Sequence, residues 1–142
     1  MIALGFRNIE LTENKRKYFQ LLADFNLDDS FLSLIHQAMD LIIEKLDTYD
    51  RRHRKLVVFV TRANSITIQY PDNNQYGSQF NAAVLLYKNM EDLNDKYKLI
   101  CIVEEFVHHF YSVSDEVETS QIVCSLIPGV TCDSSGVYYL DA

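Results

Sequence analysis

Two carboxylates stand directly before a pair of histidines in the segment VEEFVHHFYSVSDEVE, which covers residues 103–118. On a helix, residues four apart point to the same side, so Glu104 and His108 share one face and Glu105 lies beside them. A metal site needs two ligands at this spacing and a third from elsewhere, and a carboxylate such as Glu105 can act as a base on metal-bound water. Three interpretations stay open: a metal site with an unusual ligand, a decayed metal site, or a solvated helix face.

The third ligand has several candidates close by in the sequence. Glu118 falls where the buried face of the next expected helix begins, and Glu116 falls on the other side of that face. Asp115 and His109 are further donors. The alternative is that Asp115 and Glu116 are first-turn acids favoured by the helix dipole, since a helix with one apolar and one polar side is very common.

Helical spacing of apolar residues marks the N-terminal part of the chain. It is visible in LTENKRKYFQLLADFNL, residues 11–27, and is stronger in residues 29–50. We therefore expect residues 1–50 to be helical. The same spacing returns in residues 92–128, where Pro128 ends the last helix. This segment is expected to be a pair of consecutive helices that carries the acidic and histidine side chains.

Between these helical parts, β-branched and aromatic residues dominate. KLVVFVTRA and SITIQY, residues 55–63 and 65–70, are expected to form a hairpin, and FNAAVLLYKN, residues 80–89, a third strand. The sheet would then occupy residues 55–87. Helices, a small sheet of about three strands, and helices again predict an α+β fold, in a single domain over residues 1–142.

Composition restricts the classes of function. The chain has 142 residues, 48% of them hydrophobic and 23% charged, which is ordinary globular composition. A net charge of −7 argues against a nucleic-acid surface, and no apolar run is long enough to cross a membrane. Three cysteines without C-x-x-C spacing suit a reducing compartment. Because the opening MIALGF has no signal-peptide pattern, we expect a cytoplasmic protein.

One segment resembles a known family. YKNMEDLNDKYKLICIVEEFVHHFYSV, residues 87–113, is similar to the active-site segment of the ImmA/IrrE-type metallopeptidases of phages and mobile elements, whose helix carries H-E-x-x-H. VETSQIVCSLIPGV, residues 117–130, is similar to the next helix of that family. The resemblance implies a zincin-like fold, in which a small sheet is followed by an active-site helix and then by a ligand-bearing helix.

The resemblance also implies roles for individual residues. Glu105 matches the general base, His108 the second helix ligand and Glu118 the acidic third ligand, while Glu104 stands where the family has its first ligand histidine. Pro128 falls one position out of the usual register, which keeps Glu116 open as the third ligand.

Two functions follow from the resemblance. The first is a metal-dependent peptidase that hydrolyses a peptide bond with metal-activated water. Its metal would be zinc, with manganese or iron as alternatives because the donor set is rich in oxygen. The second is a catalytically inactive zincin-like module that binds a protein partner. In both cases the expected partner is a protein or peptide, for example a helix-turn-helix repressor.

Overall fold

The computed structural model describes residues 2–3, 5–46, 55–69 and 81–141. They form a mixed α/β fold that divides into two compact units. The sheet unit contains Met1–Leu27 and Arg54–Asp92, and the helical unit contains Asp28–His53 and Leu93–Ala142. Parts of the predicted segments, residues 47–50 and 70–80, lie outside the described residues. In the described part of the chain, no helix combines the length and the apolar character needed to cross a membrane.

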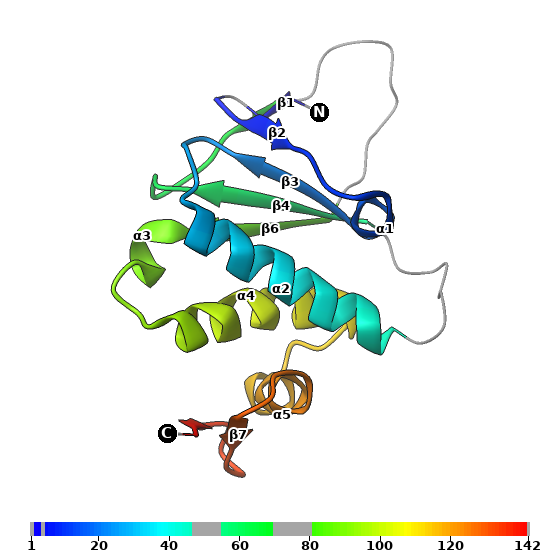
Figure 1. Cartoon of the computed structure of the whole chain (residues 1–142), viewed down its shortest axis with the longest axis vertical. Coiled ribbons are helices and arrows are strands. Elements are labelled where there is room, and N and C mark those ends of the chain that lie inside the picture. Colours follow the sequence, from blue (N-terminus) through cyan, green and yellow to red (C-terminus); the bar gives the residue numbers. More distant parts are fainter. Residues whose placement is uncertain (1, 4, 47–54, 70–80, 142) are drawn as a thin grey trace. The chain divides into compact units, whose positions relative to one another are not determined.

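Within the described residues, the main sheet of the sheet unit has four strands, whose course Figure 1 shows. Their order is β2 (Arg7–Ile9), β3 (Phe19–Ala23), β4 (Leu56–Thr61) and β6 (Asn81–Leu86). β2 runs antiparallel to β3, whereas β3, β4 and β6 run parallel to one another. All six residues of β4 are buried, as expected for the central strand of a parallel sheet. Within the described residues, β6 is an outer strand of this sheet.

Smaller elements complete the sheet unit. The short helix α1 (Glu13–Arg16) precedes β3, and α3 (Tyr87–Met90) follows β6 directly. β1 (Ile2–Ala3) pairs with β5 (Ile68–Gln69) in a separate antiparallel ribbon.

The prediction of a helix over residues 11–27 is wrong, and with it the prediction that residues 1–50 are all helical. Only α1 is helical there, and the chain then continues into β3. Phe19, Leu21 and Ala23 are buried at alternate positions, so the segment also has the period of a strand. Hydrogen bonding to β4 decides between the two periods, because the intrinsic helix preference of a short segment is weak.

The predicted hairpin between residues 55–63 and 65–70 is also wrong. β4 pairs with β3 and β6, and β5 pairs with β1. LVVFV is apolar without alternation, a pattern typical of a central parallel strand rather than of a half-exposed hairpin strand. The predicted third strand is confirmed as β6, although Tyr87 already starts α3.

The helical unit contains α2 (Asp29–Lys45), α4 (Asp95–Phe110) and α5 (Glu116–Leu126). α4 packs against both α2 and α5. Each helix begins at an acceptor side chain that receives a backbone N–H: Asp28 for α2, Asn94 for α4 and Asp115 for α5. The predicted pair of consecutive helices is therefore confirmed.

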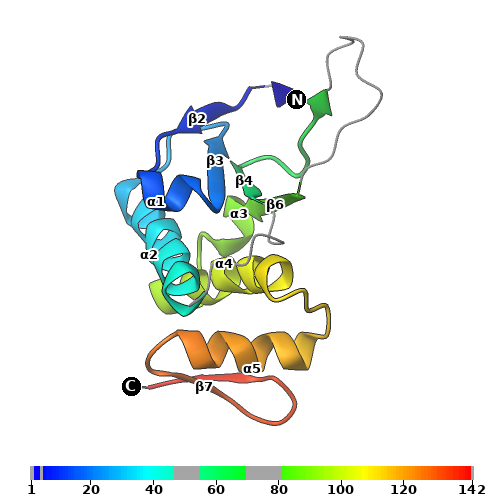
Figure 2. The same cartoon turned by 90° about the vertical axis from the view of Figure 1, so that its right-hand side faces the viewer.

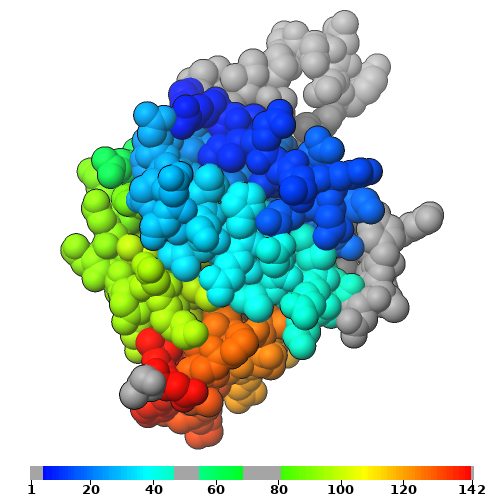
Figure 3. Space-filling view, viewed as in Figure 1, coloured from blue at the N-terminus to red at the C-terminus, as the bar shows by residue number. Residues whose placement is uncertain are grey.

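A C-terminal hairpin follows α5. Gly129 adopts φ +79°, a left-handed conformation that suits glycine, and leads from α5 into β7 (Val130–Cys132). β7 pairs antiparallel with β8 (Tyr138–Leu140) and packs along α5, as Figure 2 shows. The C-terminal residues lie at the surface in the space-filling view (Figure 3).

Candidate functional site

The face of α4 that carries Glu104, Glu105 and His108 is the candidate site. The opposite side of the helix is apolar and buried through Val103, Phe106 and its neighbours. Glu104 and His108 are half-buried, and Glu105 is exposed. The structure therefore places these three side chains on one face of one helix, as predicted from their spacing.

Glu104 is bound by the C-terminal hairpin. The phenol of Tyr138 donates a hydrogen bond to Oε1 of Glu104 at 2.5 Å. Burial, followed by this hydrogen bond, raises the pKa of the Tyr138 phenol above its usual value, so the hydroxyl keeps its proton and remains a donor. A phenol and a carboxylate at this distance form a charge-assisted hydrogen bond, which is among the stronger kinds in proteins.

His108 is oriented by the loop that joins α4 to α5. Its Nδ1 lies 2.7 Å from the carbonyl oxygen of Val113. A carbonyl can only accept, so Nδ1 carries a proton and donates it, which leaves the lone pair of the neutral tautomer on Nε2. The buried hydroxyl of Thr119 lies 3.5 Å from the same Nδ1 and donates to the carbonyl of Asp115 at 2.7 Å.

The surroundings of Glu105 change the pKa of its carboxyl group. Although the residue as a whole is exposed, neighbouring atoms partly shield its carboxyl group from water, and this desolvation is the main cause that raises its pKa. His108 opposes the shift, and the negative charges of Glu104 and Glu116 add to it. The raised pKa makes the Glu105 carboxylate a better proton acceptor than an ordinary glutamate.

The candidate third ligands have other positions or roles. Glu116 and Glu118 are exposed. The Asp115 carboxylate accepts the backbone N–H of Glu118 at 2.8 Å, which makes it the N-cap of α5. The ring of His109 contacts that of Phe110 edge to face, with centroids 4.6 Å apart.

A metal ion requires at least three ligand side chains close together, and this requirement can be checked in the structure. Throughout the described ranges, no three side chains of His, Cys, Asp or Glu gather closely enough to hold a metal ion. The structure brings Glu104 and His108 onto one face but does not add Glu118 or Glu116 to them as a third ligand. Among the described residues, Glu104 and His108 therefore do not by themselves complete a set of metal ligands, and Glu104 also accepts a hydrogen bond from Tyr138.

Tyr138 and Thr119 are parts of the site that the sequence analysis missed. GVYYLD indicates a strand, and alternation along a strand would turn one tyrosine inward and the next outward. Tyr138 is indeed half-buried and Tyr139 is 54% exposed. The partner of the inward tyrosine is 34 residues away in the sequence, and no local pattern identifies it.

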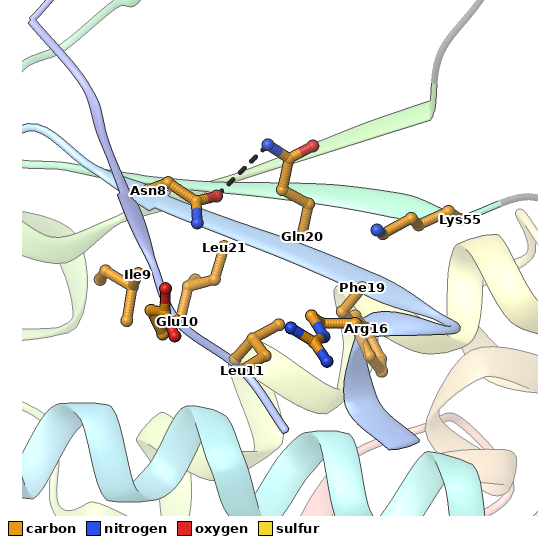
Figure 4. A pocket seen from close by; sticks show the side chains of 9 residues that line it. All are labelled: Asn8, Ile9, Glu10, Leu11, Arg16, Phe19, Gln20, Leu21 and Lys55. Carbon is orange, nitrogen blue, oxygen red and sulfur yellow. Dashed lines mark hydrogen bonds between the residues drawn. The ribbon is translucent and has the colours of Figure 1, made fainter. Parts of the chain in front are cut away.

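A separate open cavity of about 270 Å³ lies in the sheet unit (Figure 4). Its polar lining includes Arg16, Lys55 and Glu10, and the amide of Gln20 donates to Asn8 at 3.3 Å. None of the residues predicted as catalytic or metal-binding lines it.

Comparisons with known proteins identify no relative. No family model matches the chain, and neither the curated proteins nor the solved structures contain a match.

Proposed function

We propose that this chain is a zincin-like module of the ImmA/IrrE type that binds a protein partner and does not hydrolyse it. The observation that carries this proposal is the hydrogen bond from Tyr138 to Glu104. Glu104 stands at the position where the family has its first ligand histidine, and its Oε1 accepts a hydrogen bond from a phenol of the C-terminal hairpin.

Two physical arguments support a structural use of this position. A half-buried carboxylate that accepts a short hydrogen bond is stabilised where it is, and drawing it onto a metal ion would break that bond. The same bond joins β8 to α4, so Glu104 contributes to the stability of the folded chain.

The proposed partner is a protein, with a helix-turn-helix repressor as the first candidate by analogy with the family. β6 is an outer strand of the described sheet, and Val84 on it is 37% exposed. An extended segment of a partner could add to such a strand through main-chain hydrogen bonds.

A metal-dependent peptidase is the second candidate, and the orientation of His108 favours it. A histidine whose Nδ1–H is bound to a backbone carbonyl presents Nε2 in the way that metal-ligating histidines usually do. In this candidate Glu118 would have to turn toward Glu104 and His108, and the three residues would then hold zinc, or manganese or iron, which supplies the chemistry that activates water. Glu105, with its raised pKa, would accept a proton.

A hydrolysis assay separates the two candidates. Wild-type protein and the Glu105→Gln variant are incubated with a quenched fluorescent peptide library, with and without added zinc, manganese or ferrous iron. We expect no peptide cleavage above background by either protein, with or without added metal. Metal-dependent cleavage by the wild type that is lost in Glu105→Gln, with unchanged thermal stability, would overturn the proposal and establish the peptidase.

A further inference from the structure

Two of the three cysteines lie on neighbouring elements of the helical unit. Cys124 lies on α5 and Cys132 on β7, and these two elements pack together. Both thiols are free and half-buried, and the two side chains are in hydrogen-bond contact. Cys101, on α4, is also free and half-buried but is not part of this contact.

We propose that Cys124 and Cys132 are a site of reversible oxidation, at which a low-molecular-weight disulfide such as oxidised glutathione converts the two thiols into an intrachain disulfide. This inference depends on the geometry of α5 and the hairpin. It does not depend on the proposed function.

The reaction is a pair of thiol–disulfide exchanges. The Cys132 thiolate attacks one sulfur of glutathione disulfide, which forms a mixed disulfide and expels one glutathione thiolate. Cys124 then loses its proton and attacks Sγ of Cys132, which expels the second glutathione thiolate. The protein loses two electrons and two protons, and one glutathione disulfide becomes two glutathione thiols.

The order of attack follows from the surroundings of Cys124. Burial, the hydrogen bond with Cys132 and the nearness of that thiol raise the pKa of Cys124 to about 12. Because the thiolate is the nucleophile, Cys124 is the poorer first attacker, and Cys132 reacts first.

The disulfide would affect the strand that carries Tyr138. Cys132 and Tyr138 are directly opposite each other in the β7–β8 register. A covalent link from Cys132 to α5 therefore fixes the hairpin whose tyrosine binds Glu104. Oxidation would make this arrangement harder to open, because it removes conformations from the unfolded and the partly opened chain.

The test uses full-length protein equilibrated with oxidised glutathione and then alkylated with N-ethylmaleimide. Cleavage after glutamate releases residues 119–142, which contain Cys124 and Cys132 but not Cys101. Wild type is compared with Cys124→Ser and Cys132→Ser, and Cys101→Ser is the matched control. Thermal unfolding of each oxidised and reduced sample is recorded in parallel.

We expect the 119–142 fragment of wild type and of Cys101→Ser to lose two hydrogen masses, to resist alkylation and to regain both thiols with dithiothreitol. Their Tm should rise by about 5 °C on oxidation, and that of Cys124→Ser and Cys132→Ser should not. A stable glutathione adduct on Cys132 with Cys124 still open to alkylation would overturn the proposal. Disulfides that involve Cys101 or link two chains would do the same.

Discussion

The hydroxyl of Tyr138 lies 2.5 Å from Oε1 of Glu104 and joins β8 to α4 across 34 residues of sequence. The sequence suggests Glu104 as a metal ligand. In the structure its carboxylate instead accepts a hydrogen bond from a tyrosine. This hydrogen bond also gives the C-terminal hairpin a polar anchor on the helical unit.

Removing the Tyr138 hydroxyl should destabilise the protein. We expect Tyr138→Phe to lower the free energy of unfolding by about 1–2 kcal/mol, because the Glu104 carboxylate stays half-buried without its donor. Urea denaturation followed by circular dichroism measures the change. Tyr139→Phe is the matched control, since Tyr139 is 54% exposed and meets Asp133 at the surface. Equal losses in the two variants would contradict a specific role for Tyr138.

The raised pKa of Glu105 predicts how stability depends on pH. The folded state holds this proton more tightly than the unfolded state, whose pKa is near 4.5. The free energy of unfolding should therefore fall as pH rises from about 4.5 through the higher folded-state pKa. Glu105→Gln has no such proton, so its Tm should fall less than that of wild type over this range. If Tm changes with pH to the same extent in the two proteins between pH 4.5 and 7, the folded environment does not raise the pKa of Glu105.

Asp115 is expected to act as a helix cap. Its carboxylate accepts the backbone N–H of Glu118 at 2.8 Å. Asp115→Ala should lower the free energy of unfolding by about 1 kcal/mol, whereas Asp115→Asn should retain nearly all of it, because asparagine caps helices as well as aspartate does. Equal losses in Ala and Asn variants would indicate that the charge, and not the cap, is what matters.

In the sheet unit, the buried hydroxyl of Thr61 should also contribute to the free energy of unfolding. Thr61, at the end of β4, is fully buried, donates to Asp24 at 2.5 Å and accepts the backbone N–H of Ala63 at 3.0 Å. Thr61→Val keeps the shape but loses both bonds, which should cost about 1–3 kcal/mol in chemical denaturation. The control Thr131→Val, at an exposed strand position, should change stability by less than about 0.5 kcal/mol. A neutral Thr61→Val would contradict the assigned hydrogen bonds.

The sequence predicts the two helices of the candidate site well, because their signals are local. The apolar spacing and the stop at Pro128 both lie within or beside the helices that they define. The shared face of Glu104, Glu105 and His108 follows from helix geometry alone.

The sheet and the partner of Glu104 depend on contacts that the sequence does not display. Phe19, Leu21 and Ala23 fit a strand, while their neighbours also fit a helix, and pairing with β4 decides between the two. The residues of β4 do not tell which strands pair with it or whether the pairing is parallel, and the structure shows parallel pairing with β3 and β6. Tyr138 reaches Glu104 only because β8 folds back along β7, which itself packs on α5.

A zinc titration tests the central claim most directly. Metal-free wild type, Glu104→His with Tyr138→Phe, and the same double variant with His108→Ala are titrated with zinc by calorimetry, after circular dichroism confirms that each is folded. We expect no stoichiometric binding by wild type. The double variant should gain binding, because it creates an H-E-x-x-H sequence and removes the phenol that binds residue 104, and His108→Ala should abolish that gain. Stoichiometric zinc binding by wild type that is lost in His108→Ala would contradict the account and establish a metal site at Glu104 and His108.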